Sequence, residues 1–169
     1  DFGNLTQSSQ YPAATMCSST RGVYAGGRVN PNYYNNIEFI TMSTQGNAAD
    51  FGDLTYARGF GTQGITSNSV RGIIMGGYKA PVYYNYIDYI TIPTLGDATD
   101  FGDLLSVRGA AMGVSSSTRC VMMGGAAPGY TNQIQYVQIM STGDAVDFGD
   151  INTQVTAWGA GASNGHGGL

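Results

Sequence analysis

Polar and apolar residues alternate along short segments of this chain, and no segment places apolar residues at helical spacing. Across residues 87–92, Ile87 and Tyr89 share one face of an extended strand, while Ile90 and Ile92 share the other. Because apolar residues lie on both faces, we expect this strand to be covered on both sides. The pattern predicts β-strands and no helices.

The strand pattern is repeated along the chain. Asp-Phe-Gly begins at residues 1, 50, 100 and 147, and residues 33–54 are identical to residues 83–104 at 14 of 22 positions. A looser third copy covers residues 130–151. Internal repeats of about 50 residues are typical of propellers and related arrays. We therefore expect one repeat domain over residues 1–169, with units at about 6–54, 55–104 and 105–151 and a partial terminal unit at 152–169.

Each unit is expected to hold four short strands separated by turns rich in Gly, Ser and Asn. In the first unit these strands are predicted near residues 13–18, 22–26, 37–43 and 49–54. Such units predict an all-β fold built from four-stranded blades. We expect these residues to be buried or central: Phe51, Phe101, Ile40, Ile90, Ile74 and Met122, with Gly27, Gly77 and Gly125 near the convergence of the blades.

The unit resembles kelch and galactose-oxidase-type repeats, with an Arg before the second strand, a Gly-Gly pair after it and a Leu closing the fourth. Phe51-Gly52-Asp53-Leu54 stands where a kelch unit has Trp and Leu. The chain also resembles repeat-containing virion proteins of marine cyanophages, through residues 87–92, 47–55 and 163–169. These resemblances imply kelch-like blades and a structural place in a virion.

Three full units are fewer than the four to eight blades of a closed propeller. Residues 1–5 look like an isolated fourth strand, and residues 156–163 look like an isolated first strand. We therefore expect one of three arrangements: the chain is a fragment, or several copies close a ring, or three units form a three-sided β-prism. We expect a neighbouring copy, or more of the same polypeptide, to cover at least one terminal edge.

The composition of the chain argues against several classes of function. The chain has 11 acidic and 7 basic residues and a net charge of −4, which argues against binding to nucleic acid. No apolar run is long enough for a membrane helix. One histidine, His166, leaves little scope for copper or triad chemistry, and Cys17 and Cys120 are predicted to be free, buried thiols. We expect no cofactor and no enzymatic activity.

Repeated side chains are assigned structural roles. Phe51, Phe101 and Phe148 are expected to fill the space between neighbouring blades. Matching arginines, at Arg21, Arg71 and Arg119, are expected to pair with repeated aspartates at the blade rim. The aspartates at 97, 100 and 103, and again at 144, 147 and 150, are expected to accept hydrogen bonds at turns rather than to bind a metal.

The segments that follow the Gly-Gly pairs differ between units and supply the candidate binding residues. They are predicted as loops at 28–34, 78–84 and 126–131, and tyrosine and asparagine on rigid scaffolds suit recognition surfaces. The candidates are Asn32, Tyr33, Tyr34, Tyr78, Tyr83, Tyr84, Tyr130 and Asn132. Neutral divergence of the loops explains the same difference.

These observations favour a non-enzymatic structural or interaction module of a tailed-phage virion, in a tail, fibre or surface-decoration position. Its expected partners are other virion proteins, copies of itself or a host surface glycan. The alternatives are a glycan-binding or glycan-active propeller enzyme and a self-assembling filament subunit.

Overall fold

A computed structural model describes residues 1–152 and 157–162, and every regular element in that part of the chain is a β-strand. The strands are β1 (Ala14–Cys17), β2 (Arg21–Val29), β3 (Asn32–Thr41), β4 (Ala49–Asp53), β5 (Thr62–Gly64), β6 (Arg71–Lys79), β7 (Val82–Thr91), β8 (Thr99–Asp103), β9 (Ala111–Ser115), β10 (Arg119–Met123), β11 (Gln133–Gln138) and β12 (Val146–Asp150). The prediction of an all-β protein is confirmed.

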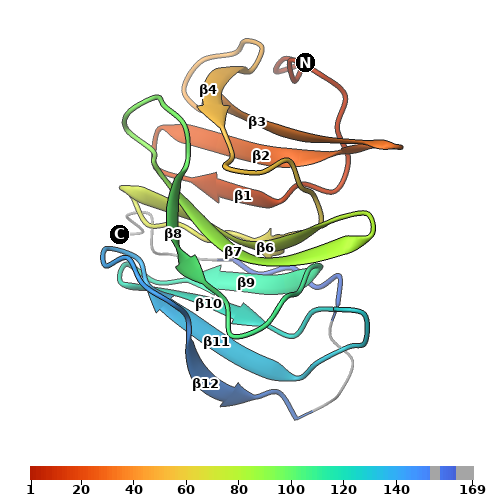
Figure 1. The fold of residues 1–169 in the computed structure, drawn as a ribbon. Helices are drawn as coiled ribbons and strands as arrows, with labels where there is room; N and C mark the ends of the chain where they lie inside the picture. The colour runs from red at the N-terminus through yellow and green to blue at the C-terminus, as the bar shows by residue number, and fades with distance from the viewer. Residues whose placement is uncertain (153–156, 163–169) are drawn as a thin grey trace.

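These strands form three sheets, with the orders β1-β2-β3-β4, β6-β7-β8 and β12-β11-β10-β9-β5. Consecutive strands within each sequence unit pair antiparallel, apart from β5. β4 and β12 lie at opposite ends of the molecule, with the middle sheet between them (Figure 1). None of the three sheets closes on itself.

The second unit departs from the expected four-stranded sheet, because β5 pairs in parallel with β9 of the third unit. Two threonine hydroxyls connect this segment to β6 in place of a regular backbone ladder. Thr62 Oγ1 donates to the carbonyl of Met75 at 2.9 Å, and Thr66 Oγ1 donates to the carbonyl of Ile73 at 2.6 Å. These side chains take carbonyl groups of β6 that an antiparallel neighbour would otherwise bind. The backbone of β5 pairs with β9 instead, while the segment just after β5 still bridges to β6 through Ser67 and Gly72.

A repeated set of backbone hydrogen bonds joins the fourth strand of one unit to a turn of the next. Gly46, Gly96 and Gly143 N–H groups donate to the carbonyls of Phe2, Phe51 and Phe101, and Ala48, Ala98 and Ala145 donate to those of Asn4, Asp53 and Asp103, all at 2.8 Å. Residues 1–5 therefore dock on the first unit as a fourth strand docks on its successor. Gly102, at φ +145°, is required there, since an added Cβ would lie 2.5 Å from the carbonyl oxygen of Gly143.

Two clusters of buried side chains form the core between the sheets. Phe51 and Phe101 are each 3% exposed, whereas Phe148 is 55% exposed. The expectation that Phe148 fills a space between blades is wrong, because no further sheet follows β12 among the described residues. Ile40 is only half-buried, while its counterpart Ile90 is buried against the first sheet. Ile74 and Met122 are buried as expected.

Cys17 on β1 and Cys120 on β10 are free thiols on different sheets, as predicted. Cys120 is buried, but Cys17 is only partly so, which corrects the expectation of two buried thiols. Burial raises the pKa of both thiols, and more strongly for Cys120.

Candidate functional site

The first two predicted binding loops are the ends of regular hairpins. β2 and β3 stay paired as far as Val29 and Asn32, and β6 and β7 stay paired as far as Lys79 and Val82. The register shifts at the Gly-Gly pairs, and such a bulge bends the ladder without ending it. Only the third segment, 126–131, lies outside the regular strands. The aromatic residues of the first two segments are therefore held by a rigid backbone.

Because side chains alternate along a strand, the candidate tyrosines divide between two places. Tyr33, Tyr78 and Tyr83 lie together: the ring centroids are 6.2 Å apart for Tyr33 and Tyr78, and 4.6 Å apart for Tyr78 and Tyr83. Tyr84 instead stacks with Tyr86 at 5.2 Å. The structure thus brings some of the predicted binding residues together and separates others.

Three rings that sequence reasoning missed complete the first group. The ring centroids are 4.4 Å apart for Tyr11 and Phe60, 5.6 Å for Phe60 and Trp158, and 6.0 Å for Tyr11 and Trp158. Phe60 also lies 6.1 Å from Tyr78 and so joins the two sets. We call these six residues the central aromatic cluster: Tyr11, Tyr33, Phe60, Tyr78, Tyr83 and Trp158.

A ladder of backbone hydrogen bonds positions the rings of Tyr11, Phe60 and Trp158. Tyr11, Phe60, Ala110 and Trp158 occupy matching positions in successive units and have left-handed φ angles of 54°, 53°, 54° and 66°. The N–H of Phe60 donates to the carbonyl of Tyr11 at 3.0 Å, Ala110 to Phe60 at 2.6 Å, and Trp158 to Ala110 at 3.0 Å. Each unit thus adds one side chain to a common stack, and in the third unit that side chain is only a methyl group.

The central aromatic cluster has a distinct electrostatic environment. The Arg28 guanidinium lies over the rings of Tyr33 and Phe60, 5.5 and 5.9 Å from their centroids. Burial, together with Tyr78, Tyr130 and Tyr33 nearby, raises the pKa of Tyr83. Its hydroxyl therefore stays a neutral donor and acceptor at physiological pH.

The remaining candidates lie elsewhere. Asn32 is exposed at the first hairpin end, and Tyr34 shares its strand but makes no ring contact within the described residues. Tyr130 is 59% exposed on the third segment. The side chain of Asn132 donates to the carbonyl of Ile151 at 3.4 Å, so it holds the backbone beside β12.

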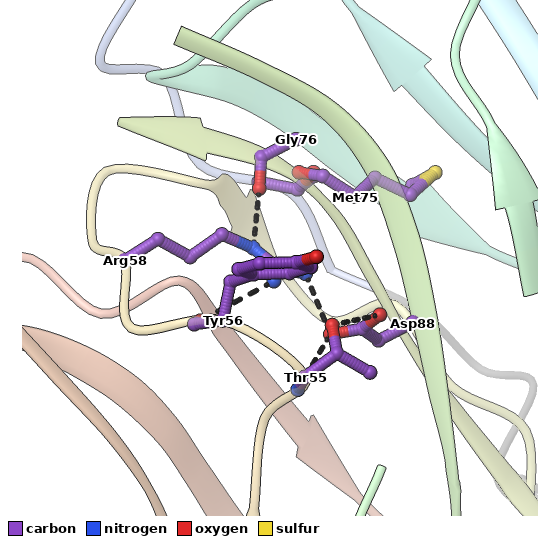
Figure 2. A network of polar contacts seen from close by, with 7 residues as sticks. Thr55, Tyr56, Arg58, Met75, Gly76 and Asp88 are labelled. Atoms are coloured by element: carbon purple, nitrogen blue, oxygen red, sulfur yellow. Dashed lines mark hydrogen bonds and ion pairs between the residues drawn. The ribbon is translucent and has the colours of Figure 1, made fainter. Parts of the chain in front are cut away.

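A buried ion pair in the second unit is the other feature that sequence reasoning missed. Arg58 and Asp88 are 0% and 1% exposed, and Nη2 of Arg58 lies 2.9 Å from Oδ2 of Asp88. Nε of Arg58 donates to the carbonyl of Gly76 at 2.9 Å, and Thr55 Oγ1 donates to the Asp88 carboxylate at 2.8 Å. Figure 2 shows Arg58 reaching between Gly76 and Asp88, with Thr55 below the carboxylate. The pair links the segment before β5 to β6 and β7.

The same position is filled differently in the other two units. In the first, Ser9 stands where Arg58 does, and Glu38 is held by the backbone N–H and hydroxyl of Thr6 and by Asn36. In the third, Gln135 replaces the carboxylate, and Arg108 donates to Gln133 Oε1 at 2.6 Å. Desolvation lowers the pKa of Arg108.

The repeated arginines at the rim do not pair with aspartates in the described part of the chain. Nη1 of Arg21 donates to the carbonyl of Ile92 at 2.6 Å, and Nη1 of Arg71 donates to that of Ile139 at 3.2 Å. Arg21, Arg71 and Arg119 lie over the rings of Phe39, Tyr89 and Tyr136 at 4.7, 4.3 and 4.8 Å. The predicted Arg–Asp pairing is wrong. Each of the three arginines lies over an aromatic ring instead of an aspartate, and Arg21 and Arg71 also donate to a carbonyl of the next unit.

Two of the repeated aspartates act at turns. Asp97 Oδ1 accepts the N–H of Asp53, and Asp144 Oδ1 accepts the N–H of Asp103, both at 2.9 Å. These bonds hold each fourth strand to the next unit. Within residues 1–152 and 157–162, no group of three or more His, Cys, Asp or Glu side chains gathers as metal ligands would. The same residues include no helix able to cross a membrane.

Comparison with known proteins identifies no relative. No protein family matches the sequence, and no curated protein is significantly similar to it.

Proposed function

We propose that this chain is a non-enzymatic interaction module that binds a glycan on a host surface through its central aromatic cluster. The observation that carries the proposal is the gathering of six rings on an all-β scaffold: three from the two hairpins, Tyr11 and Phe60 from the segments before β1 and β5, and Trp158. Aromatic side chains supply contact area at low conformational cost, and their hydroxyls supply hydrogen bonds.

The roles of the reactive side chains support a non-enzymatic function. Asp88 neutralises Arg58, and Asp97 and Asp144 hold turns. The Cys120 thiol is buried, and its pKa is raised. Each of these groups has a structural task that explains its placement.

We also infer that the three sheets are consecutive kelch-like blades of a propeller arrangement. The same hydrogen bonds join each fourth strand to the next unit, and one backbone ladder links Tyr11, Phe60, Ala110 and Trp158. The resemblance to cyanophage virion proteins gives the module its proposed location, a virion, where a rigid array would present the central aromatic cluster to a host cell.

A second role, self-association, is favoured by the exposed Phe148. Phe148 is 55% exposed, and a second copy packed against the outer side of β12 would bury that ring. Light scattering of the full chain tests this: we expect assembly in the wild type and a shift to monomer for Phe148→Asp. A wild-type monomer at high concentration would contradict it.

The glycan proposal is tested by binding the full chain to an array of purified cell-surface glycans. We expect at least one glycan to be retained, and Tyr78→Ala to lose it. Tyr56→Ala is the matched control, since Tyr56 is an exposed tyrosine that stacks with Tyr86, outside the central aromatic cluster. Retention of no glycan, or equal loss in both variants, would refute the proposal.

A further inference from the structure

A cavity of about 230 Å³ lies within the central aromatic cluster. Its walls are the rings of Phe60, Tyr78, Tyr83 and Trp158, and its remaining lining residues are Ala110 and Ala126. Trp158 is 58% exposed, so one wall is open to an approaching ligand.

Two small residues of the third unit create this cavity. Ala110 stands at the ladder position that holds Tyr11, Phe60 and Trp158 elsewhere. Ala126 occupies the position of Tyr78 in the second unit, since Ala126 bonds to Gly109 as Tyr78 bonds to Gly59. The cavity is therefore a local departure from the repeat: two alanines leave space that larger side chains fill in the other units.

The residue types that line the cavity indicate which class of ligand it would bind. Four of the six lining residues are aromatic, and their polar groups are the hydroxyls of Tyr78 and Tyr83 and the indole N–H of Trp158. None of the lining residue types is acidic or basic. A quaternary ammonium group would suit an aromatic cage, but the guanidinium of Arg28 already lies over the Phe60 ring and would repel it. A neutral ligand with apolar faces and hydroxyl edges fits better.

Size restricts the ligand further. Pockets for drug-sized molecules have volumes of roughly 300–1,000 Å³, so this one takes a smaller group. We propose that the cavity is a subsite for one neutral pyranose ring of a glycan, stacked on the aromatic walls with its hydroxyls bonded to Tyr78 and Tyr83. The inference rests on the proposed glycan-binding function and names the ligand class that the central aromatic cluster selects.

Trp158 makes the subsite directly observable, because it is the one tryptophan of the chain. We expect millimolar titration with at least one neutral methyl pyranoside to change the Trp158 fluorescence of the full-length protein and to reach saturation. Sialic acid and N-acetyltyrosinamide serve as the charged and the protein-like probes. A response confined to either of these, or to no probe, would overturn the assignment to a neutral sugar.

Ala110→Phe is the decisive variant, since it restores the ring that the repeat position carries elsewhere. Phe60 already adopts φ 53° against 54° for Ala110, so the backbone accommodates the change. The added ring fills the cavity, and we expect the affinity for the pyranoside to fall about tenfold or more. Tyr56→Ala should bind as the wild type does.

The two proposals fail in different ways. If glycans on the array are retained through Tyr78 while Ala110→Phe binds them normally, the subsite is wrong and the glycan-binding function stands. If no glycan is retained at all, both are wrong. Circular dichroism and the urea midpoint of Ala110→Phe must match the wild type, and Trp158→Ala gives a second loss-of-binding variant at an exposed position.

Discussion

Two phenylalanines of the same Asp-Phe-Gly motif offer a direct test of how the units are packed. Phe101 is 3% exposed between the second and third sheets, and Phe148 is 55% exposed on the outer side of β12. Phe101→Ala removes a buried ring and leaves a cavity, which costs about 3–5 kcal/mol. Phe148→Ala removes a ring with about half its surface already in water and should cost about 1 kcal/mol or less.

Urea unfolding followed by circular dichroism measures this difference. With a slope of roughly 2 kcal/mol per molar urea, Phe101→Ala should lower the unfolding midpoint by about 1.5–2.5 M, and Phe148→Ala by about 0.5 M or less. Both measurements are made at low protein concentration, because association through Phe148 would bury that ring. Equal shifts at the two positions in a monomeric protein would refute the packing described.

Two further predictions concern buried polar groups. Asp88→Asn should cost about 3–5 kcal/mol in the same urea assay, since it leaves Arg58 buried without a counter-charge, and a loss below about 1 kcal/mol would contradict this. Native Cys120 should resist iodoacetamide until urea unfolds the chain, while Cys17 reacts sooner. The raised pKa of Cys120 makes stability constant below about pH 9 and lower as pH rises above it, because only the unfolded chain then loses that proton. Cys120→Ala should reduce this alkaline decline, and an unchanged pH profile would show that other groups cause it.

The strands that recur in every unit could be predicted from the sequence. The alternation in residues 87–92 placed β7, and the repeat carried that assignment to β3 and, more loosely, to β11. The likeness of residues 1–5 to a fourth strand could be predicted from Asp-Phe-Gly, but their docking on the first unit of the same chain was not: the carbonyl of Phe2 accepts the bond that the carbonyls of Phe51 and Phe101 accept.

Features that differ between units could not be predicted in the same way. The second unit differs because β5 pairs with β9 and reaches β6 through the hydroxyls of Thr62 and Thr66. The ladder that joins Tyr11, Phe60, Ala110 and Trp158 was missed because its side chains differ in every unit. Their shared property is a left-handed backbone, and neither alternation nor composition reveals that conformation.

The position of the Arg58–Asp88 ion pair shows which contacts every unit shares and which vary between units. Arg58 and Asp88 form an ion pair in the second unit, while a carboxylate without an arginine stands in the first and an arginine without a carboxylate in the third. The backbone bonds from each fourth strand to the next turn are 2.8 Å in all three junctions. The ion pair is therefore not a condition for stacking the units, because two of them stack without it. The backbone bonds at the junctions are the contacts that all three units share, while positions such as Ala110 and Ala126 differ between units and line the cavity proposed as a sugar subsite.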